Sequence, residues 1–272
     1  MLVDTHCHLN FSAYDKDRST IIEKARENQI TGILCPGVDL KTSQECVDLA
    51  ERYQEIYAAI GIHPTDLSDW TSEGIKKILD LKTPKVLAIG EIGLDYYRAQ
   101  NNHKNQQEVF LEQLIIALEL DIPVIIHARN ANDEGFEVYD DIYQILITWR
   151  NSLEKRNSKL FHMPGVFHSF SGNSYWANKY IELGFMIGIS GPITYNKASI
   201  LRNVVEVSPV ENLLIETDSP FLTPAPFRGK RNQPDYVHFV AKKIAEIKKM
   251  TFESVAQVTT LNSWRLFGWQ VI

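Results

Sequence analysis

The sequence is poor in cysteine and has no long apolar run. Its three cysteines, Cys7, Cys35 and Cys46, are an odd number without paired spacing, which indicates a reducing compartment. No apolar run approaches the roughly 20 residues that a membrane span needs. The N-terminus also lacks the charged segment followed by an apolar one that marks a signal peptide. We therefore expect a cytoplasmic protein that has no membrane partner.

Basic residues are outnumbered as well. The chain has 28 Lys and Arg against 34 Asp and Glu, for a net charge of −6. This balance excludes proteins that coat nucleic acid by bulk electrostatics. It does not exclude a nuclease, because metal ions and a few local basic residues can supply affinity for phosphate. The 272 residues are enough to bury a sizeable core, as one large domain or two small ones.

Eight short apolar segments alternate with helical segments along the chain. The predicted strands cover residues 3–8, 33–35, 56–62, 86–91, 124–127, 165–168, 185–189 and 212–218. Near-continuous apolar strands separated by helices predict a parallel sheet that is covered on both faces. Eight such units favour an α/β fold of the closed (β/α)₈ TIM-barrel type, and an open doubly wound sheet is the alternative.

No composition shift or linker divides the chain, so we expect a single domain over residues 1–272. The polar connection at 155–162 is predicted to be a surface loop. Two helices close the chain, and Thr251 is a plausible N-cap for the second of them.

The first predicted strand ends in His6-Cys7-His8. Residues two apart in a strand point to the same face, roughly 6.6 Å apart, so both imidazoles can approach one metal ion. Cys7 then points to the opposite face and into packing. Taken alone, the pattern fits two polar residues at a frayed N-terminus equally well.

Further candidate ligands end other predicted strands. They are Glu91 on the fourth, His127 on the fifth, His168 on the sixth and Asp218 on the eighth. Barrel active sites are built at the C-terminal ends of the strands, so these side chains should meet on one rim. Each has an ordinary explanation as a buried histidine or an exposed carboxylate, but their common placement predicts a metal site.

The number of candidate ligands predicts two divalent ions, because four histidines and two carboxylates exceed what one tetrahedral ion uses. Glu91 is central in strand order and is expected to bridge the ions. The expected ligands are His6, His8 and Asp218 for one ion, and His127 and His168 for the other. Such a set suits Mg²⁺, Mn²⁺ or Zn²⁺ and does not choose among them.

Other polar residues are expected on the same rim. His63 follows the third strand and could orient substrate or ligands, or simply pack a loop. The basic residues expected to hold phosphate are Arg129, Arg228, Lys230 and Arg231, with a solvated charged face as the alternative. The remaining histidines are read as structural or surface residues: His103, His162 and His238.

Six motifs together resemble those of the TatD family of metal-dependent deoxyribonucleases. They are Asp-Thr-His-Cys-His at 4–8, Gly-Ile-His-Pro at 61–64, Gly-Glu-Ile-Gly-Leu-Asp-Tyr-Tyr at 90–97, Val-Ile-Ile-His-Ala-Arg at 124–129, Gly-Val-Phe-His-Ser-Phe-Ser-Gly at 165–172 and Glu-Thr-Asp-Ser-Pro at 216–220. The match runs end to end and includes the basic stretch through Asn232. The resemblance implies a barrel, divalent-metal dependence and DNA hydrolysis, and it places the ligands on the six residues named above.

Two features depart from the family pattern. Ser169 stands where many relatives have cysteine, and the connection at 151–162 is longer than usual. The longer connection could alter the substrate groove, so the preference for single or double strands stays open.

These features predict a divalent-metal-dependent deoxyribonuclease that is exonucleolytic and monomeric, with DNA as substrate and no obligate protein partner. A metal-bound water would attack phosphorus, Asp218 would accept its proton, and Glu91 would bridge the ions. One alternative is an amide or ester hydrolase of the same barrel group, such as an aminoacyl-ester deacylase. Many of those enzymes bridge their metals with a carbamylated lysine, where this chain has Glu91. A non-enzymatic, metal-dependent binding protein is the other alternative.

Overall fold

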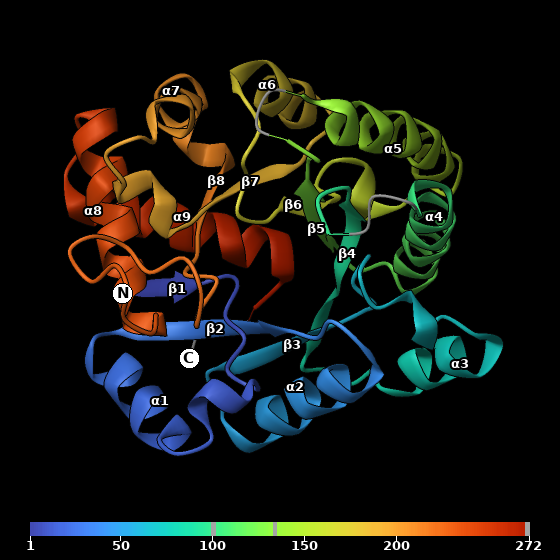
Figure 1. Ribbon diagram of the computed structural model, residues 1–272, viewed down its shortest axis with the longest axis horizontal. Helices are drawn as coiled ribbons and strands as arrows, with labels where there is room; N and C mark the ends of the chain where they lie inside the picture. Colours follow the sequence, from blue (N-terminus) through green and yellow to red (C-terminus); the bar gives the residue numbers. More distant parts are fainter. Residues whose placement is uncertain (99–101, 133–134, 270–272) are drawn as a thin grey trace.

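The computed structural model describes residues 1–98, 102–132 and 135–269, whose strands form one parallel sheet in chain order (Figure 1). The strands are β1 Leu2–Asp4, β2 Ile30–Pro36, β3 Ile56–Ile60, β4 Val86–Asp95, β5 Val124–Arg129, β6 Gly165–Phe167, β7 Met186–Ile189 and β8 Leu213–Ile215. The first and last strands meet where the Thr5 N–H donates to the Ile215 carbonyl at 3.2 Å. The predicted (β/α)₈ barrel is therefore confirmed, and the open sheet is excluded.

Helices surround the barrel and connect its strands. They are α1 Arg18–Glu27, α2 Leu40–Arg52, α3 Ser72–Asp80, α4 His103–Leu120, α5 Glu137–Lys155, α6 Ser174–Glu182, α7 Ser199–Val207, α8 Val237–Lys248 and α9 Phe252–Phe267. Thr251 caps α9 as predicted, since its hydroxyl accepts from the Ser254 N–H at 3.1 Å. In the described part of the chain, no helix combines the length and apolarity that a membrane crossing requires.

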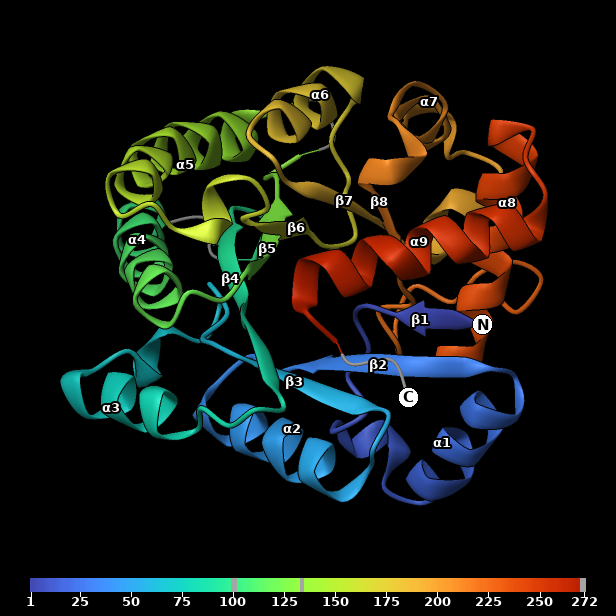
Figure 2. The same cartoon turned by 180° about the vertical axis from the view of Figure 1, so that it is seen from behind.

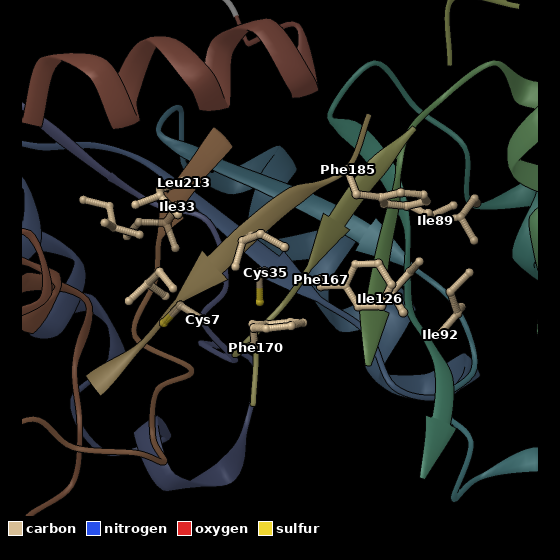
Figure 3. Close-up of a cluster of buried hydrophobic side chains, with 14 of the residues drawn as sticks. Cys7, Ile33, Cys35, Ile89, Ile92, Ile126, Phe167, Phe170, Phe185 and Leu213 are labelled. Atoms are coloured by element: carbon tan, nitrogen blue, oxygen red, sulfur yellow. The ribbon is translucent and has the colours of Figure 1, made fainter. Parts of the chain in front are cut away.

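Apolar side chains form two buried layers. One lies between the strands and the outer helices, and Figure 3 shows Cys7 and Cys35 within it, as predicted for Cys7. The other fills the barrel interior around Val3 and Leu34. Figure 2 shows α9 lying across the barrel, and Phe267 at its end packs into the interior layer. These contacts involve the N-terminal halves of the strands, so the C-terminal rim is left for a site.

The fourth strand is longer than predicted. It continues past Glu91 to Asp95 because Ile92 and Leu94 are buried and keep pairing with β5. The β4–β5 register shifts between Ile89 and Ile92, and such an irregularity re-aims the side chains beside it. The expectation that Glu91 ends its strand was wrong. His127 also lies inside its strand, two residues before the end of β5.

The first and last strands are shorter than predicted. β1 ends at Asp4 and β8 ends at Ile215, so His6, His8 and Asp218 lie in the segments that follow. These segments still pair: the Asp218 N–H donates to the His6 carbonyl at 2.8 Å. The chain therefore stays extended beyond the end of β1, and His6 and His8 still face the same side.

The connection after α5 is not a plain surface loop, as the sequence suggested. A turn of 3₁₀ helix, Lys159–Phe161, interrupts it, and the Leu160 side chain is buried in the core. The correction follows from Leu160 and Phe161, two apolar residues in a polar stretch, since Phe161 also packs against the core.

Candidate metal centre

Glu91 lies at the centre of the C-terminal rim, with one carboxylate oxygen facing each of two groups of histidines. Its Oε2 lies 3.4 Å from Nε2 of His6 and 3.7 Å from Nε2 of His8. Its Oε1 lies 2.8 Å from Nδ1 of His127 and 2.9 Å from Nε2 of His168. The structure thus brings together the predicted ligands on both sides of the predicted bridging residue.

The first donor set consists of His6, His8, Asp218 and the Oε2 atom of Glu91. The two Nε2 atoms lie 3.2 Å apart. Asp218 Oδ1 lies 3.7 Å from Nε2 of His6 and 3.5 Å from Nε2 of His8. Four ligands about 2.0–2.1 Å from a tetrahedral ion are separated by about 3.3–3.4 Å, which is close to all of these separations. The donors therefore fit a divalent ion.

The second donor set consists of His127, His168 and the Oε1 atom of Glu91, whose ligand atoms lie within 4.8 Å of one another. His63 stands beside them, with Nε2 at 3.6 Å from Glu91 Oε1. Two imidazoles and a carboxylate oxygen suit a second divalent ion that keeps open positions. Other groupings of these side chains, such as His6 with His168 and Glu216, also come within ligand distance, so the division of ligands expected from strand order stays a prediction.

Three buried carboxylates that the sequence reasoning did not assign hold these ligands in place. Asp95 Oδ2 lies 3.1 Å from Nε2 of His127, so it fixes the ring while Nδ1 faces Glu91. Asp4 accepts from the Thr217 N–H at 2.9 Å and thereby ties the two ligand-bearing segments after β1 and β8 together. The third is Glu216, and all three stand inside motifs quoted from the sequence, at 4–8, 90–97 and 216–220, so membership of a motif was the signal that could have identified them.

Glu216 lies behind His168. Its Oε1 is 3.7 Å from Nδ1 of His168 and accepts a hydrogen bond from the Ser169 N–H. A Cβ at Gly188 would come within 2.7 Å of this carboxylate, so the absence of a side chain there makes room for it. Burial raises the pKa of Glu216 to about 7.

Protonation of the rim is set by burial and by the central carboxylate. Burial alone would raise the pKa of Glu91, but His168, His127 and His6 outweigh it and hold that pKa well below its usual range. Burial opposes a proton on His168, yet the charge of Glu91 raises the pKa of His168 to about 10. Burial and the neighbouring His168 lower the pKa of His6 to about 4.

Metal binding is expected to release protons and to strengthen as pH rises. Without metal, His168 carries a proton at pH 7, because its pKa of about 10 lies above that pH, and the pKa of His127 is raised as well. Since a ligating imidazole must be neutral, affinity should rise about tenfold per pH unit for each proton released. Calorimetric titration with Mn²⁺ at pH 7 in two buffers of different ionisation enthalpy measures the number of protons. A pH-independent affinity with no proton release would contradict this protonation pattern.

The basic residues of the rim differ in what they contact. Arg231 pairs with Asp17, with one guanidinium nitrogen 2.6 Å from Oδ2, so its charge is engaged within the chain. The guanidinium of Arg228 lies 4.1 Å from the ring centroid of Tyr195, and Lys230 is exposed. Phosphate contact by these three and by Arg129 remains a prediction.

The three histidines set aside as structural or surface residues belong to neither donor set. His162 and His238 are exposed. His103 stacks on Tyr96 with ring centroids 3.6 Å apart.

Comparison with known proteins identifies the relatives of this chain. Residues 3–268 match the family model described as TatD related DNase. The metal-dependent hydrolase YabD of Bacillus subtilis is 41% identical over 268 residues, covering 98% of this chain and 99% of YabD. The Escherichia fergusonii protein named 3'-5' ssDNA/RNA exonuclease TatD is 33% identical, covering 98% of this chain and 99% of that protein. The crystal structure of the Escherichia coli TatD homologue YjjV superposes with a TM-score of 0.87 at 32% identity, covering 99% of this chain and 98% of that one.

Proposed function

The chain belongs to the TatD family of metal-dependent hydrolases, and on that basis we propose that it hydrolyses phosphodiester bonds of DNA from a strand end. The observation that carries the proposal is the pair of donor sets that share Glu91 at the barrel rim. Two ions about 3.5–4 Å apart are the arrangement that stabilises both the attacking and the leaving oxygen of a phosphoryl displacement. The exonuclease name of the Escherichia fergusonii relative supports the same substrate class.

Each rim residue has a distinct part in this proposal. Divalent ions would supply Lewis-acid activation of water and neutralise charge on the phosphate. Glu91 would hold both ions, and Asp218 would bind one of them and accept the proton from the attacking water. Burial lowers the pKa of His63 to about 3, so this residue is neutral and suited to orienting the substrate without repelling the ions.

The test is cleavage of end-labelled DNA. Single-stranded and double-stranded oligonucleotides would each be incubated with Mg²⁺, Mn²⁺ or Zn²⁺, alongside nitrophenyl phosphodiesters and aminoacyl esters. We expect stepwise shortening of DNA from one end with at least one metal, and none after chelation. Turnover of the esters without any cleavage of DNA would instead assign the chain to the ester hydrolases of this barrel group.

Replacing Lys230 with alanine is expected to weaken DNA binding by the same factor for all sequences. Lys230 is exposed in the loop after β8, so it can reach a phosphate but has no fixed geometry for reading bases. The slope of log affinity against log salt should fall by about 0.7 for single strands, the value of one lost phosphate contact. Fluorescence anisotropy over a series of salt concentrations measures this slope.

Lys155→Ala is the matched control, because Lys155 is exposed in the last turn of α5, at the opposite end of the barrel. Arg231→Ala tests whether the pair with Asp17 opens on binding; a slope change as large as that of Lys230→Ala would show that it does. If Lys230→Ala changes neither the salt slope nor the affinity, Lys230 does not contact phosphate and belongs to a solvated charged surface.

A further inference from the structure

Two phenyl rings, those of Phe11 and Phe221, lie beside the first donor set. The Phe11 ring stacks on His8 with centroids 4.5 Å apart and planes 17° apart. The Phe221 ring lies 6.3 Å from that of His8 and 6.1 Å from that of Phe11, edge-on to both. Phe221 is 52% exposed. A large apolar ring is therefore half open to solvent next to two candidate metal ligands.

Each phenyl ring is carried by the same tight turn as a candidate ligand. The Phe11 N–H donates to the His8 carbonyl at 3.2 Å, and the Phe221 N–H donates to the Asp218 carbonyl at 2.9 Å. The buried Asn232 amide also donates to the Phe221 carbonyl at 2.6 Å. The backbone of Phe221 is thus fixed relative to the donor set, while its ring is left uncovered.

Packing against His8 and Phe11 leaves Phe221 52% exposed, so part of its ring is free to contact a ligand. A nuclease must hold the nucleotide as well as its phosphate, and an open aromatic ring binds any nucleobase by stacking. We propose that Phe221, supported by Phe11, is the stacking platform for the base next to the scissile phosphate. The proposal rests on the proposed nuclease function and specifies how its substrate is held.

The platform also selects the form of the substrate. A base inside a duplex has both faces covered by its neighbours, so it must leave the stack before it can lie on Phe221. A single strand or a frayed end presents such a base at little cost. The substrate class is therefore nucleic acid with an unpaired base at the cleavage position.

The experiment compares an intact oligothymidylate with two matched oligomers that lack the base at the terminal or at the penultimate nucleotide. In the unmodified enzyme, loss of one of these bases should raise KM by about 5- to 150-fold, which corresponds to about 1–3 kcal/mol of stacking. Phe221→Ala should raise KM for the intact oligomer by a similar factor, with little change in kcat. The same substitution should leave KM for the sensitive abasic oligomer unchanged, because no base is left to stack.

Phe221→Tyr keeps an aromatic face, so its KM should again depend on the presence of the base. Phe221→Leu replaces the alanine variant if alanine disturbs the fold, because leucine keeps apolar bulk without an aromatic face. Leu261→Ala is the matched control: it truncates a 42% exposed apolar side chain on α9, across the other end of the barrel.

If the unmodified enzyme cleaves all three oligomers with equal KM, the stacking role of Phe221 is wrong while the proposed nuclease function stands. An equal rise of KM for intact and abasic oligomers in Phe221→Ala would also overturn it. If no oligomer is cleaved with Mg²⁺, Mn²⁺ or Zn²⁺, the proposed function fails and the platform fails with it.

Discussion

Replacing Glu91 with alanine is expected to abolish turnover and to lower the amount of bound metal. The substitution removes one oxygen from each donor set, because Oε2 faces His6 at 3.4 Å and Oε1 faces His168 at 2.9 Å. It also removes a buried negative charge that would offset the charge of two bound divalent ions. We expect kcat to fall by more than about 10⁴, beyond what a positioned acid–base group alone contributes. Steady-state kinetics and elemental analysis of the dialysed protein measure the two effects.

Glu154→Ala is the control for this substitution, since Glu154 is an exposed carboxylate near the end of α5 on the far side of the barrel. It should retain full activity and metal content. Glu91→Gln offers a graded comparison, because an amide oxygen can serve one donor set but carries no charge for the second. Two ions bound to Glu91→Ala together with a near-normal rate would rule out the bridging role.

Replacing Asp218 with asparagine is expected to separate metal binding from proton transfer. As a ligand, Asp218 needs an oxygen lone pair, which an amide keeps; as a base, it needs a carboxylate, which an amide lacks. Its backbone φ of 56° is left-handed, and asparagine adopts this conformation readily, so the turn should be preserved. We expect most of the metal to remain while kcat falls by roughly 10²–10⁴.

The pH dependence gives a second readout for Asp218. Burial opposes ionisation, but the hydrogen bond from His8 and the charge of His168 outweigh it and lower the pKa of this carboxyl. Asp218 is therefore an ionised acceptor at neutral pH, and an acidic limb of the pH–rate profile that reports it should disappear in the asparagine variant. If the metal stays bound and kcat falls by less than about tenfold, Asp218 is a ligand without a role as base.

The sequence contained most of the ligand set because periodicity and topology determine it. His6 and His8 are two residues apart, and parallel strands carry their C-terminal ends to one rim, so convergence of the ligands follows from the strand pattern. The barrel itself followed from eight repeated units. Both the ligand set and the barrel can be predicted from local residue spacing and from the known handedness of the connection between parallel strands.

The features of the site that could not be predicted from the sequence depend on contacts between residues that are distant along the chain. Asp95 reaches His127 across 32 positions, and Arg231 is held by Asp17 across 214. Glu91 lies inside β4 because Ile92 and Leu94 beyond it are buried and pair with β5, and this pairing is set by the partner strand. The exposure of Phe221 beside Phe11 likewise depends on two turns that meet only in the folded chain.

The most direct test of the shared carboxylate is a crystal structure of the protein soaked in Mn²⁺, with anomalous differences recorded at the manganese edge. We predict two anomalous peaks about 3.5–4 Å apart, one among His6, His8 and Asp218 and the other beside His127 and His168, with one oxygen of Glu91 on each. A single peak, or two peaks of which Glu91 touches only one, would contradict the account.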